Sequence, residues 1–341
     1  MDRGYVWRLI GSEWVVPVGI VLVAWISSLL GAALAFVFQS DGPHSFRRFV
    51  AFCFPRKVFG HQLRLDVAFA LARRFLYPFV VAPVVIGVAT LAYFCHQALA
   101  AIFGAVPAHD PGLWQQLFCF FVFVAYQDFG NFYYHRLAHR VPWLWEFHAV
   151  HHSATMLTPP TNRRFHPLQD IYDSFVYQIP PGLFIGIFSY AAQVSLLRTT
   201  VLGIDAWFLV NMLSFYQLRH SHIYLRYPRW LERWIMSPAQ HQIHHSKNPE
   251  HVDRNFGVLT SIWDRLWGTL VYSDTTDPDH FELGLASEQH RYVTFVQLYA
   301  TPLVNYGRRA KEFFQDGFAR CFPRADRPAV SDESWGGKGG D

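Results

Sequence analysis

The amino-acid sequence predicts an all-α protein, an integral-membrane helical bundle of about four to five spans with a cytosolic helical cap. Three observations support this fold class. The chain of 341 residues is 52% hydrophobic and only 16% charged, whereas soluble domains carry about 25% charged residues. Apolar stretches long enough to cross a bilayer recur along the chain, and basic residues gather beside them. The formal net charge of +4 is too small to predict a nucleic-acid partner.

Five apolar stretches are the predicted spans. They cover residues 15–39, 75–106, 113–134, 171–190 and 196–215. The first stretch contains no charged residue and lacks a net basic flank, which predicts a retained helix rather than a cleaved signal peptide. The last two are interrupted by Pro180 and Pro181 and carry Asp173, Arg198 and Asp205. They therefore fit either a helical hairpin or a re-entrant element.

The distribution of Lys and Arg predicts how the spans are oriented. Residues 47–74 and the segments after His135 and Tyr216 are rich in Lys and Arg, and residues 107–112 contain neither. Since cytoplasmic loops carry the excess of basic residues, the N-terminus is expected outside and the histidine-rich segments on the cytosolic side. The membrane would be a bacterial inner membrane or the endoplasmic reticulum.

The chain divides into three predicted regions. Residues 1–112 form an N-terminal transmembrane region, residues 113–285 a catalytic region, and residues 286–341 a C-terminal region that ends in a flexible polar tail. Within the catalytic region, residues 217–285 are expected to form the cytosolic cap of helices and loops. The sequence shows no internal repeat.

Cysteine and histidine usage narrows the chemistry. The four cysteines lie far apart without a CxxC pair, which argues against a disulfide scaffold, a thiolate zinc site and an iron–sulfur cluster. The 18 histidines, in contrast, are concentrated in a few short segments. Histidine is therefore the residue type expected to carry the site.

Three histidine clusters have the spacing of metal ligands. The first is an HxxxH motif, and the other two are HxxHH motifs, with ligand candidates His135, His139, His148, His151, His152, His241, His244 and His245. Positions i, i+3 and i+4 share one face of a helix, so their imidazoles can reach one metal. Adjacent histidines diverge, which suits two neighbouring metals. No Glu follows His135, which excludes the HExxH motif of zinc proteases.

The order of these motifs resembles the fatty acid hydroxylase / sterol desaturase superfamily. The matching text runs from QDFGNFYYHRLAHR through WEFHAVHHS, RRFHP, RHSHI and SPAQHQIHHSKN to NFGVLTSIWDRLWGT, about Gln127 to Thr269. The resemblance implies a cytosolic diiron centre, with two iron ions and dioxygen as co-substrate, that oxidises C–H bonds of a lipid, sterol or fatty-acyl substrate. It assigns the eight clustered histidines and His220 as iron ligands.

The same resemblance assigns roles around the ligands. Asp128 and Asp264 match family carboxylates and are the predicted catalytic acidic groups, expected to accept the N–H groups of ligand histidines. His222 is expected as an outer partner of the ligands, and His166 receives no assigned role. Hydroxylation is favoured over desaturation, with ether cleavage as a third outcome. The carbon attacked and the oligomeric state stay open.

Other classes of protein also concentrate histidine. A membrane metal transporter would place its ligands along a mid-span pathway. A structural zinc site uses four ligands, about half the number found here. A bis-histidine haem protein needs single histidines on facing helices rather than adjacent pairs. The enzyme is favoured, and the transporter and the zinc protein remain the alternatives.

An oxygen-dependent enzyme of this kind needs an external source of electrons. The sequence has no His-Pro-Gly-Gly haem loop, no ferredoxin-like cysteine run and no GxGxxG motif after a strand. The expected partner is therefore a ferredoxin or a cytochrome b5-type protein with its reductase. Basic residues near the clusters are expected to face phospholipid headgroups, and some of them could instead dock such a donor. They are Arg136, Arg140, Arg163, Arg164, Arg226, Arg229, Arg233 and Lys247.

Overall fold

The computed structural model describes residues 18–39, 42–81, 87–105, 112–192, 200–201, 204–276 and 282–316. Apart from one pair of two-residue strands, these residues form helices and loops, so the all-α class is confirmed. The helices are α2 (Val18–Gln39), α3 (Phe46–Cys53), α4 (His61–Val80), α5 (Val88–Phe103), α6 (Leu113–Arg140), α7 (Pro142–His152), α8 (Pro167–Tyr177), α9 (Ile179–Ala192), α10 (Ala206–Leu213), α11 (Arg229–Glu232), α12 (Pro238–His244), α13 (Ile262–Trp267) and α14 (Phe295–Asp316). Strands β1 (Thr200–Val201) and β2 (Ile204–Asp205) are antiparallel.

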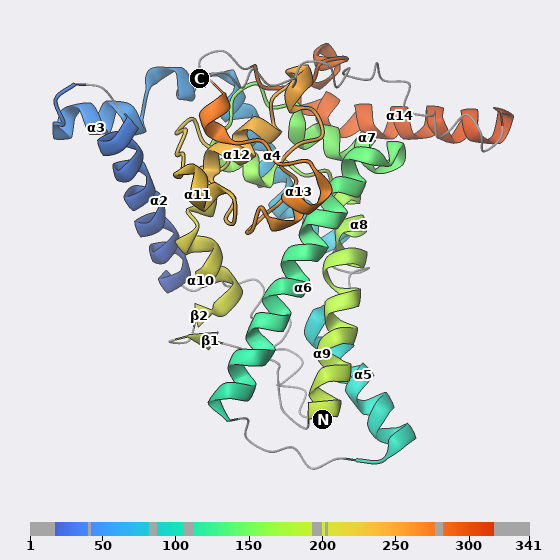
Figure 1. The fold of residues 1–341 in the computed structure, drawn as a ribbon. Coiled ribbons are helices and arrows are strands. Elements are labelled where there is room, and N and C mark those ends of the chain that lie inside the picture. The colour runs from blue at the N-terminus through green and yellow to red at the C-terminus, as the bar shows by residue number, and fades with distance from the viewer. Residues whose placement is uncertain are drawn as a thin grey trace, which may run out of the picture.

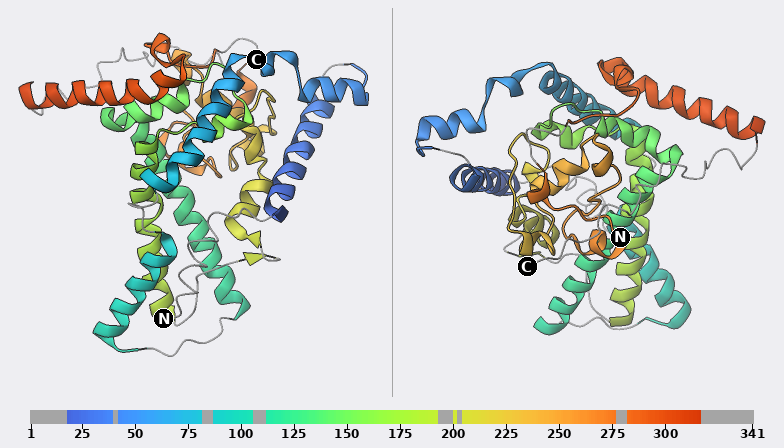
Figure 2. Two further views of the ribbon diagram at one scale, coloured as in Figure 1. Left: turned by 180° about the vertical axis from the view of Figure 1, so that it is seen from behind. Right: turned by 45° about the horizontal axis from the view of Figure 1, so that its top comes forward.

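The helices separate into a cap and a set of long helices below it (Figure 1). Helices α7, α12 and α13 gather in the cap, and α5, α6 and α9 extend away from it. Helices α3 and α14 leave opposite sides of the cap, and α14 lies across the direction of the long helices in both views (Figures 1 and 2). The cap is therefore attached at one end of the long helices.

Two glycines allow α5 and α9 to pack closely. A Cβ added at Gly182 would lie 2.6 Å from the Cβ of Leu91, and one at Gly186 would lie 2.7 Å from the carbonyl oxygen of Ala92. Both distances are shorter than any real contact between such atoms. Small residues at such crossings bring helix backbones together, as is common between helices in membranes.

Two described helical segments are long and apolar enough to cross a membrane, Leu22–Gln39 and Pro167–Ala192. Their number is smaller than the four to five spans predicted from the sequence. Many large apolar side chains of the long helices are nevertheless exposed, including Trp25, Phe79, Phe103, Trp114 and Phe121. An exposed apolar surface of this extent marks contact with lipid or with another protein.

Two of the predicted spans are not single continuous helices in the structure. The stretch 75–106 is divided between the end of α4 and the separate helix α5, with Gly87 as the N-cap residue of α5 and residues 82–86 outside the description. The stretch 196–215 contains the strand pair and the short helix α10. Hydrophobicity alone missed these breaks because a window of apolar residues does not record where a helix begins and ends.

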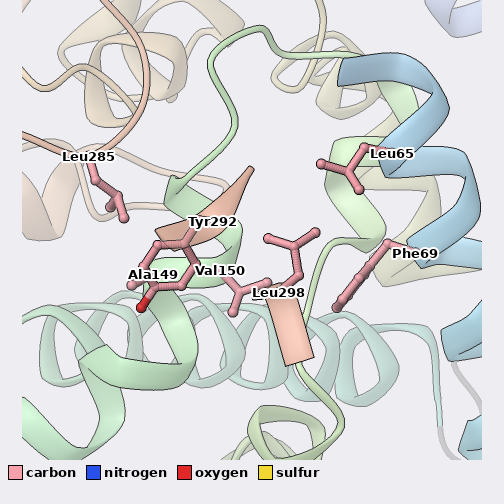
Figure 3. Close-up of a cluster of buried hydrophobic side chains, with 7 residues drawn as sticks. All are labelled: Leu65, Phe69, Ala149, Val150, Leu285, Tyr292 and Leu298. Carbon is pink, nitrogen blue, oxygen red and sulfur yellow. The ribbon is translucent and has the colours of Figure 1, made fainter. Parts of the chain in front are cut away.

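A hydrophobic cluster fixes α7, the helix of the first HxxHH motif. Ala149 and Val150 of α7 pack with Leu65 and Phe69 of α4, and Leu285, Tyr292 and Leu298 complete the cluster (Figure 3). Elements from all three predicted regions therefore share one core. The boundaries drawn at residues 112 and 285 stay a prediction.

A buried polar network reinforces the contact between α4 and the loop after α7. Arg164 Nη1 lies 2.8 Å from Asp66 Oδ1, and both side chains are fully buried. The Arg164 Nε–H also donates to the carbonyl oxygen of Val150. Arg164 is therefore a structural residue, and its buried side chain can face neither a phospholipid nor an electron donor. The role of the other basic residues stays a prediction.

Candidate metal centre

The three histidine motifs lie on α6, α7 and α12, whose histidine-bearing parts meet in the cap. Helix α6 carries His135 and His139 in its last turns, and a single residue, Val141, separates it from α7, which begins at Pro142. Helix α12 begins with Ser237 and Gln240 in a reciprocal capping box and with Pro238 in the first turn. These local signals set where each ligand-bearing helix begins, and so which way its histidines face.

All nine predicted ligand histidines come together in two groups. The first histidine group contains His135, His139, His148, His152 and His244, and the second contains His151, His220, His241 and His245. Within each group, the candidate ligand nitrogens lie within 4.8 Å of one another. Each adjacent pair, His151–His152 and His244–His245, contributes one residue to each group, as the motif spacing predicted.

The contacts within the second group fit a metal better than hydrogen bonds. The Nε2 atom of His220 lies 3.0 Å from that of His151, 3.1 Å from that of His241 and 3.2 Å from that of His245. One ring nitrogen has one hydrogen or one lone pair, so it cannot make three hydrogen bonds at once. Nitrogens that each bind a metal at about 2.0–2.1 Å lie roughly 3 Å apart.

The first group shows the same pattern with its outer nitrogens held. His135 Nδ1–H donates to the carbonyl oxygen of Phe256 at 2.8 Å, and His244 Nδ1–H donates to that of Arg254 at 2.7 Å. This tautomer leaves the lone pair of Nε2 directed inward. The Nε2 atom of His244 is buried and has no hydrogen-bond partner among the described residues. A bound metal ion would satisfy it.

Burial keeps the histidines in the neutral form that binds metals. Desolvation lowers the pKa of His135 to about 4, opposed in part by its bond to the Phe256 carbonyl. Desolvation, followed by the nearby charge of Arg219, lowers the pKa of His220 to about 3. Both imidazoles are therefore neutral at physiological pH.

The two predicted catalytic carboxylates lie beside the centre and bind a loop. Asp128 accepts from the backbone N–H groups of Leu259 and Thr260, and Asp264 accepts from those of Phe256 and Gly257. No hydrogen bond joins either carboxylate to a ligand histidine in the described part of the chain. Asp264 instead positions Phe256, whose carbonyl oxygen holds His135. A direct catalytic role for the two carboxylates stays a prediction.

The two histidines with unsettled roles lie outside both groups. His166 is the N-cap residue of α8, where its Nδ1 accepts from the backbone N–H of Leu168. The Nε2 of His222 lies 2.9 Å from the carbonyl oxygen of Phe52, at the end of α3. The His166 contact caps its own helix, whereas the His222 contact joins two distant segments and differs from the expected place beside the ligands.

The metal centre is bordered by two cavities. The span-side cavity, about 550 Å³, has His135, His148, His151, His220 and His241 in its wall, together with residues of α6, α8 and α10. The cap-side cavity, about 460 Å³, is bounded by His139, His152 and His244. Two separate approaches to the histidine groups follow from this arrangement.

Sequence reasoning missed the groups that orient the ligands. The backbone carbonyls of Arg254 and Phe256 cannot be recognised from a sequence motif. Gln169 contacts His148, 21 positions away, with its Nε2 atom 3.0 Å from the ring Nδ1. The available signal was the presence of Gln169, Asp170 and Asp173 in an otherwise apolar segment. Polar residues in such segments often mark functional sites.

The fold and the site define a class, a helical protein with two adjacent histidine groups that could hold metal ions at one end of its long apolar helices. Residues 120–269 match the family model described as fatty acid hydroxylase. The segment therefore belongs to the fatty acid hydroxylase family, and the resemblance predicted from the motifs is confirmed.

Several curated proteins are similar to the chain. It is 29% identical to the alkylglycerol monooxygenase of Homo sapiens, over 51% of this chain and 37% of that protein. It is 27% identical to an ornithine lipid hydroxylase of Rhizobium tropici, over 58% of this chain and 54% of that protein. It is 31% identical to a Delta(7)-sterol 5(6)-desaturase of Gibberella zeae, over 47% of this chain and 39% of that protein. The matched part thus covers less than two thirds of each relative, and no solved structure matches the chain.

Proposed function

We propose that this protein is a membrane-bound oxidoreductase that uses two iron ions and dioxygen to hydroxylate a C–H bond of a lipid. The observation that carries the proposal is the pair of histidine groups, which offer nine buried or nearly buried imidazoles. Bound iron would supply the reduction of dioxygen. The named similarity to lipid hydroxylases and a sterol desaturase supports lipid as the substrate class.

The residues of this chain would prepare the site for that reaction. The two groups hold neutral imidazoles close together, and the carbonyls of Phe256 and Arg254 fix the rings of His135 and His244. Burial of the centre keeps bulk water away from the reacting carbon. Hydroxylation consumes one C–H bond, one dioxygen, two electrons and two protons, and it yields one alcohol and one water.

The electron requirement implies a partner. We expect a ferredoxin or a cytochrome b5-type protein with its reductase, and the cap-side cavity offers the approach to His139 and His152. Purified, iron-loaded protein with NADPH, dioxygen and lipid should be inactive alone and active when the donor is added. Turnover with NADPH alone would contradict this partner.

The proposed location is an integral membrane, with the metal centre facing the cytosol. The two long apolar segments and the exposed apolar side chains support it. A reporter fused after Thr269 is expected to read cytosolic. A lumenal or periplasmic signal would overturn the orientation.

The decisive test is the product. Purified protein loaded with iron should contain close to two iron ions per chain and should add one labelled oxygen atom from ¹⁸O₂ to a lipid extract. Loss of two hydrogens without added oxygen would indicate desaturation instead. A metal content near one, or zinc-loaded protein with no oxidised lipid under any donor, would favour a structural metal site.

A further inference from the structure

The walls of the two larger cavities differ in chemistry. An apolar cavity of about 790 Å³ lies between α2, α10 and α11, with Leu34, Phe38, Leu213 and Ile235 in its wall. No histidine of either group is among the residues lining it. The span-side cavity, which does reach the histidines, is bordered by Gln127, Asn131 and Asp173 instead. The part of the substrate that meets the metals therefore enters polar surroundings.

Some polar groups of the span-side cavity are paired with each other, and others are buried without a partner among the described residues. The guanidinium of Arg73 binds Asp170 through two hydrogen bonds of 2.8 Å and 2.6 Å. The Tyr134 hydroxyl and the side chain of Gln169 both bond to the carboxyl group of Asp173. The remaining oxygen, Asp173 Oδ1, is buried and has no hydrogen-bond partner in the described part of the chain. A buried carboxylate oxygen without a partner is costly unless a ligand or water donates to it.

Asp173 lies one helical turn from Gln169, a residue that contacts a candidate metal ligand. Asp173 lies four residues after Gln169 on α8, and the side chain of Gln169 lies 3.0 Å from the ring of the candidate ligand His148. Residues four apart on a helix are neighbours, with Cβ atoms about 5–6 Å apart. A group bound at Asp173 would thus lie only a few bonds from a carbon held at the metals.

We propose that the span-side cavity binds the polar head of the substrate lipid, with Asp173 accepting a hydrogen bond from a hydroxyl or an ammonium group. The oxidised C–H bond then lies next to the head rather than in the middle of a hydrocarbon chain. This inference rests on the proposed function and names its substrate class. A plain hydrocarbon would leave the buried polar groups of the cavity unsatisfied, which selects against it.

Binding can be measured before any electron donor is present. The probes are a vicinal long-chain diol, the dimethyl ether of the same diol, and a long-chain primary amine, each added to iron-loaded protein in detergent. The diol or the amine should bind about tenfold to a hundredfold more tightly than the ether. Equal affinity for all three probes would overturn the inference. Preference for the amine over the diol would identify ammonium as the recognised group.

Two variants separate binding from folding. Asp173→Asn should raise the Kd for the preferred probe by about tenfold or more while leaving iron content and the affinity for the ether unchanged. A purely structural role would instead weaken all probes equally. Glu250→Gln, which removes an exposed carboxylate, is the matched control and should behave as the parent protein. If binding follows this pattern but no probe is oxidised, the proposed function fails and the head-group site stands.

Discussion

The two histidine groups differ in what holds the outer side of their rings. In the first group, His135 and His244 donate to backbone carbonyls and His148 contacts Gln169. In the second, the Nδ1 atoms are buried without a hydrogen-bond partner among the described residues, as seen at His151, His220, His241 and His245. The first group is therefore oriented by the fold itself, whereas the second is oriented mainly by the ring contacts among its own members.

This difference should affect how tightly each group would hold a metal ion. Partners on the outer nitrogen fix the tautomer and the ring direction, and removal of such a partner typically weakens metal binding by about tenfold to a hundredfold. The first group presents rings already set for a metal. The second must lose ring freedom when the metal binds, so its metal should be the weaker one.

The largest expected effect comes from removing a ligand. Changing His139 or His152 of the first group, or His245 of the second, to Ala should abolish turnover, because an incomplete ligand set loses its metal geometry. Each variant should still insert into the membrane, since insertion depends on the apolar helices. Product formation and iron content measured together check this expectation, and normal activity in all three variants would defeat the ligand assignment.

The control for these variants is a histidine away from both groups. His290 is exposed and takes no part in the clusters, so His290→Ala should retain activity. His109, which lies in the predicted outside turn, would serve the same purpose, but it falls outside the described residues. A loss of activity in the His290 variant would show that the assay responds to any change in the cap.

The next largest expected effect tests whether the two histidine groups hold their metals with different affinity. Titration with a chelator should remove the two iron ions in two steps, with affinities that differ by about tenfold or more. Combining the titration with His245→Ala should eliminate the weaker step and leave the tighter one. One cooperative step that releases both metals would show that the groups are held equally well.

The ligands could be predicted from sequence because their spacing is local. HxxxH and HxxHH place histidines on one helical face whatever the rest of the chain does. The partners of their outer nitrogens depend on contacts between distant segments. His135 meets Phe256 across 121 positions, and neither a backbone carbonyl nor such a pairing appears in a motif.

The spans were harder to predict than the ligands. Helix α4 contains Asp66, which pairs with Arg164, and Arg73, which pairs with Asp170. Each partner lies nearly a hundred positions away in the sequence. Helix α6 carries polar residues at Gln127 and Asn131 that line the span-side cavity. Such residues lower the apparent hydrophobicity of a helix although the protein, not water, surrounds them. A count of apolar stretches therefore does not distinguish well between a helix that crosses a membrane and a helix that supports a site.

A smaller effect is expected from Gln169. Gln169→Leu removes the contact to His148 while keeping the size of the side chain, so the tighter metal should bind about tenfold more weakly. The weaker metal should be unaffected, because no residue of the second group bonds to Gln169 in the described structure. Gln115→Leu, on the far end of α6, is the matched control. Equal weakening of both metals would mean that Gln169 supports the fold rather than one ligand.

The smallest effect is the pH dependence of stability in metal-free protein. Histidines have a pKa of 6.5 when unperturbed, and the fold lowers it to about 4 for His135 and about 3 for His220. Between these values the unfolded chain binds more protons than the folded one, so stability should fall as the pH drops below 6.5. The pKa of Asp264 is raised from 3.8 to about 6 by burial, which gives the opposite slope. The clustered histidines outnumber the carboxyl groups whose pKa burial raises, so the net effect is acid destabilisation.

Thermal unfolding of metal-free protein should check this sign. The midpoint should be lower at mildly acidic pH than at neutral pH, and His245→Gln should flatten the profile because glutamine does not titrate. Bound iron should reduce the effect in mildly acidic solution, since a coordinated nitrogen cannot take up a proton until the metal leaves. If the unfolding midpoint of the metal-free protein does not change across this range, the histidines are already hydrated. The packed groups described here would then form only when metal binds.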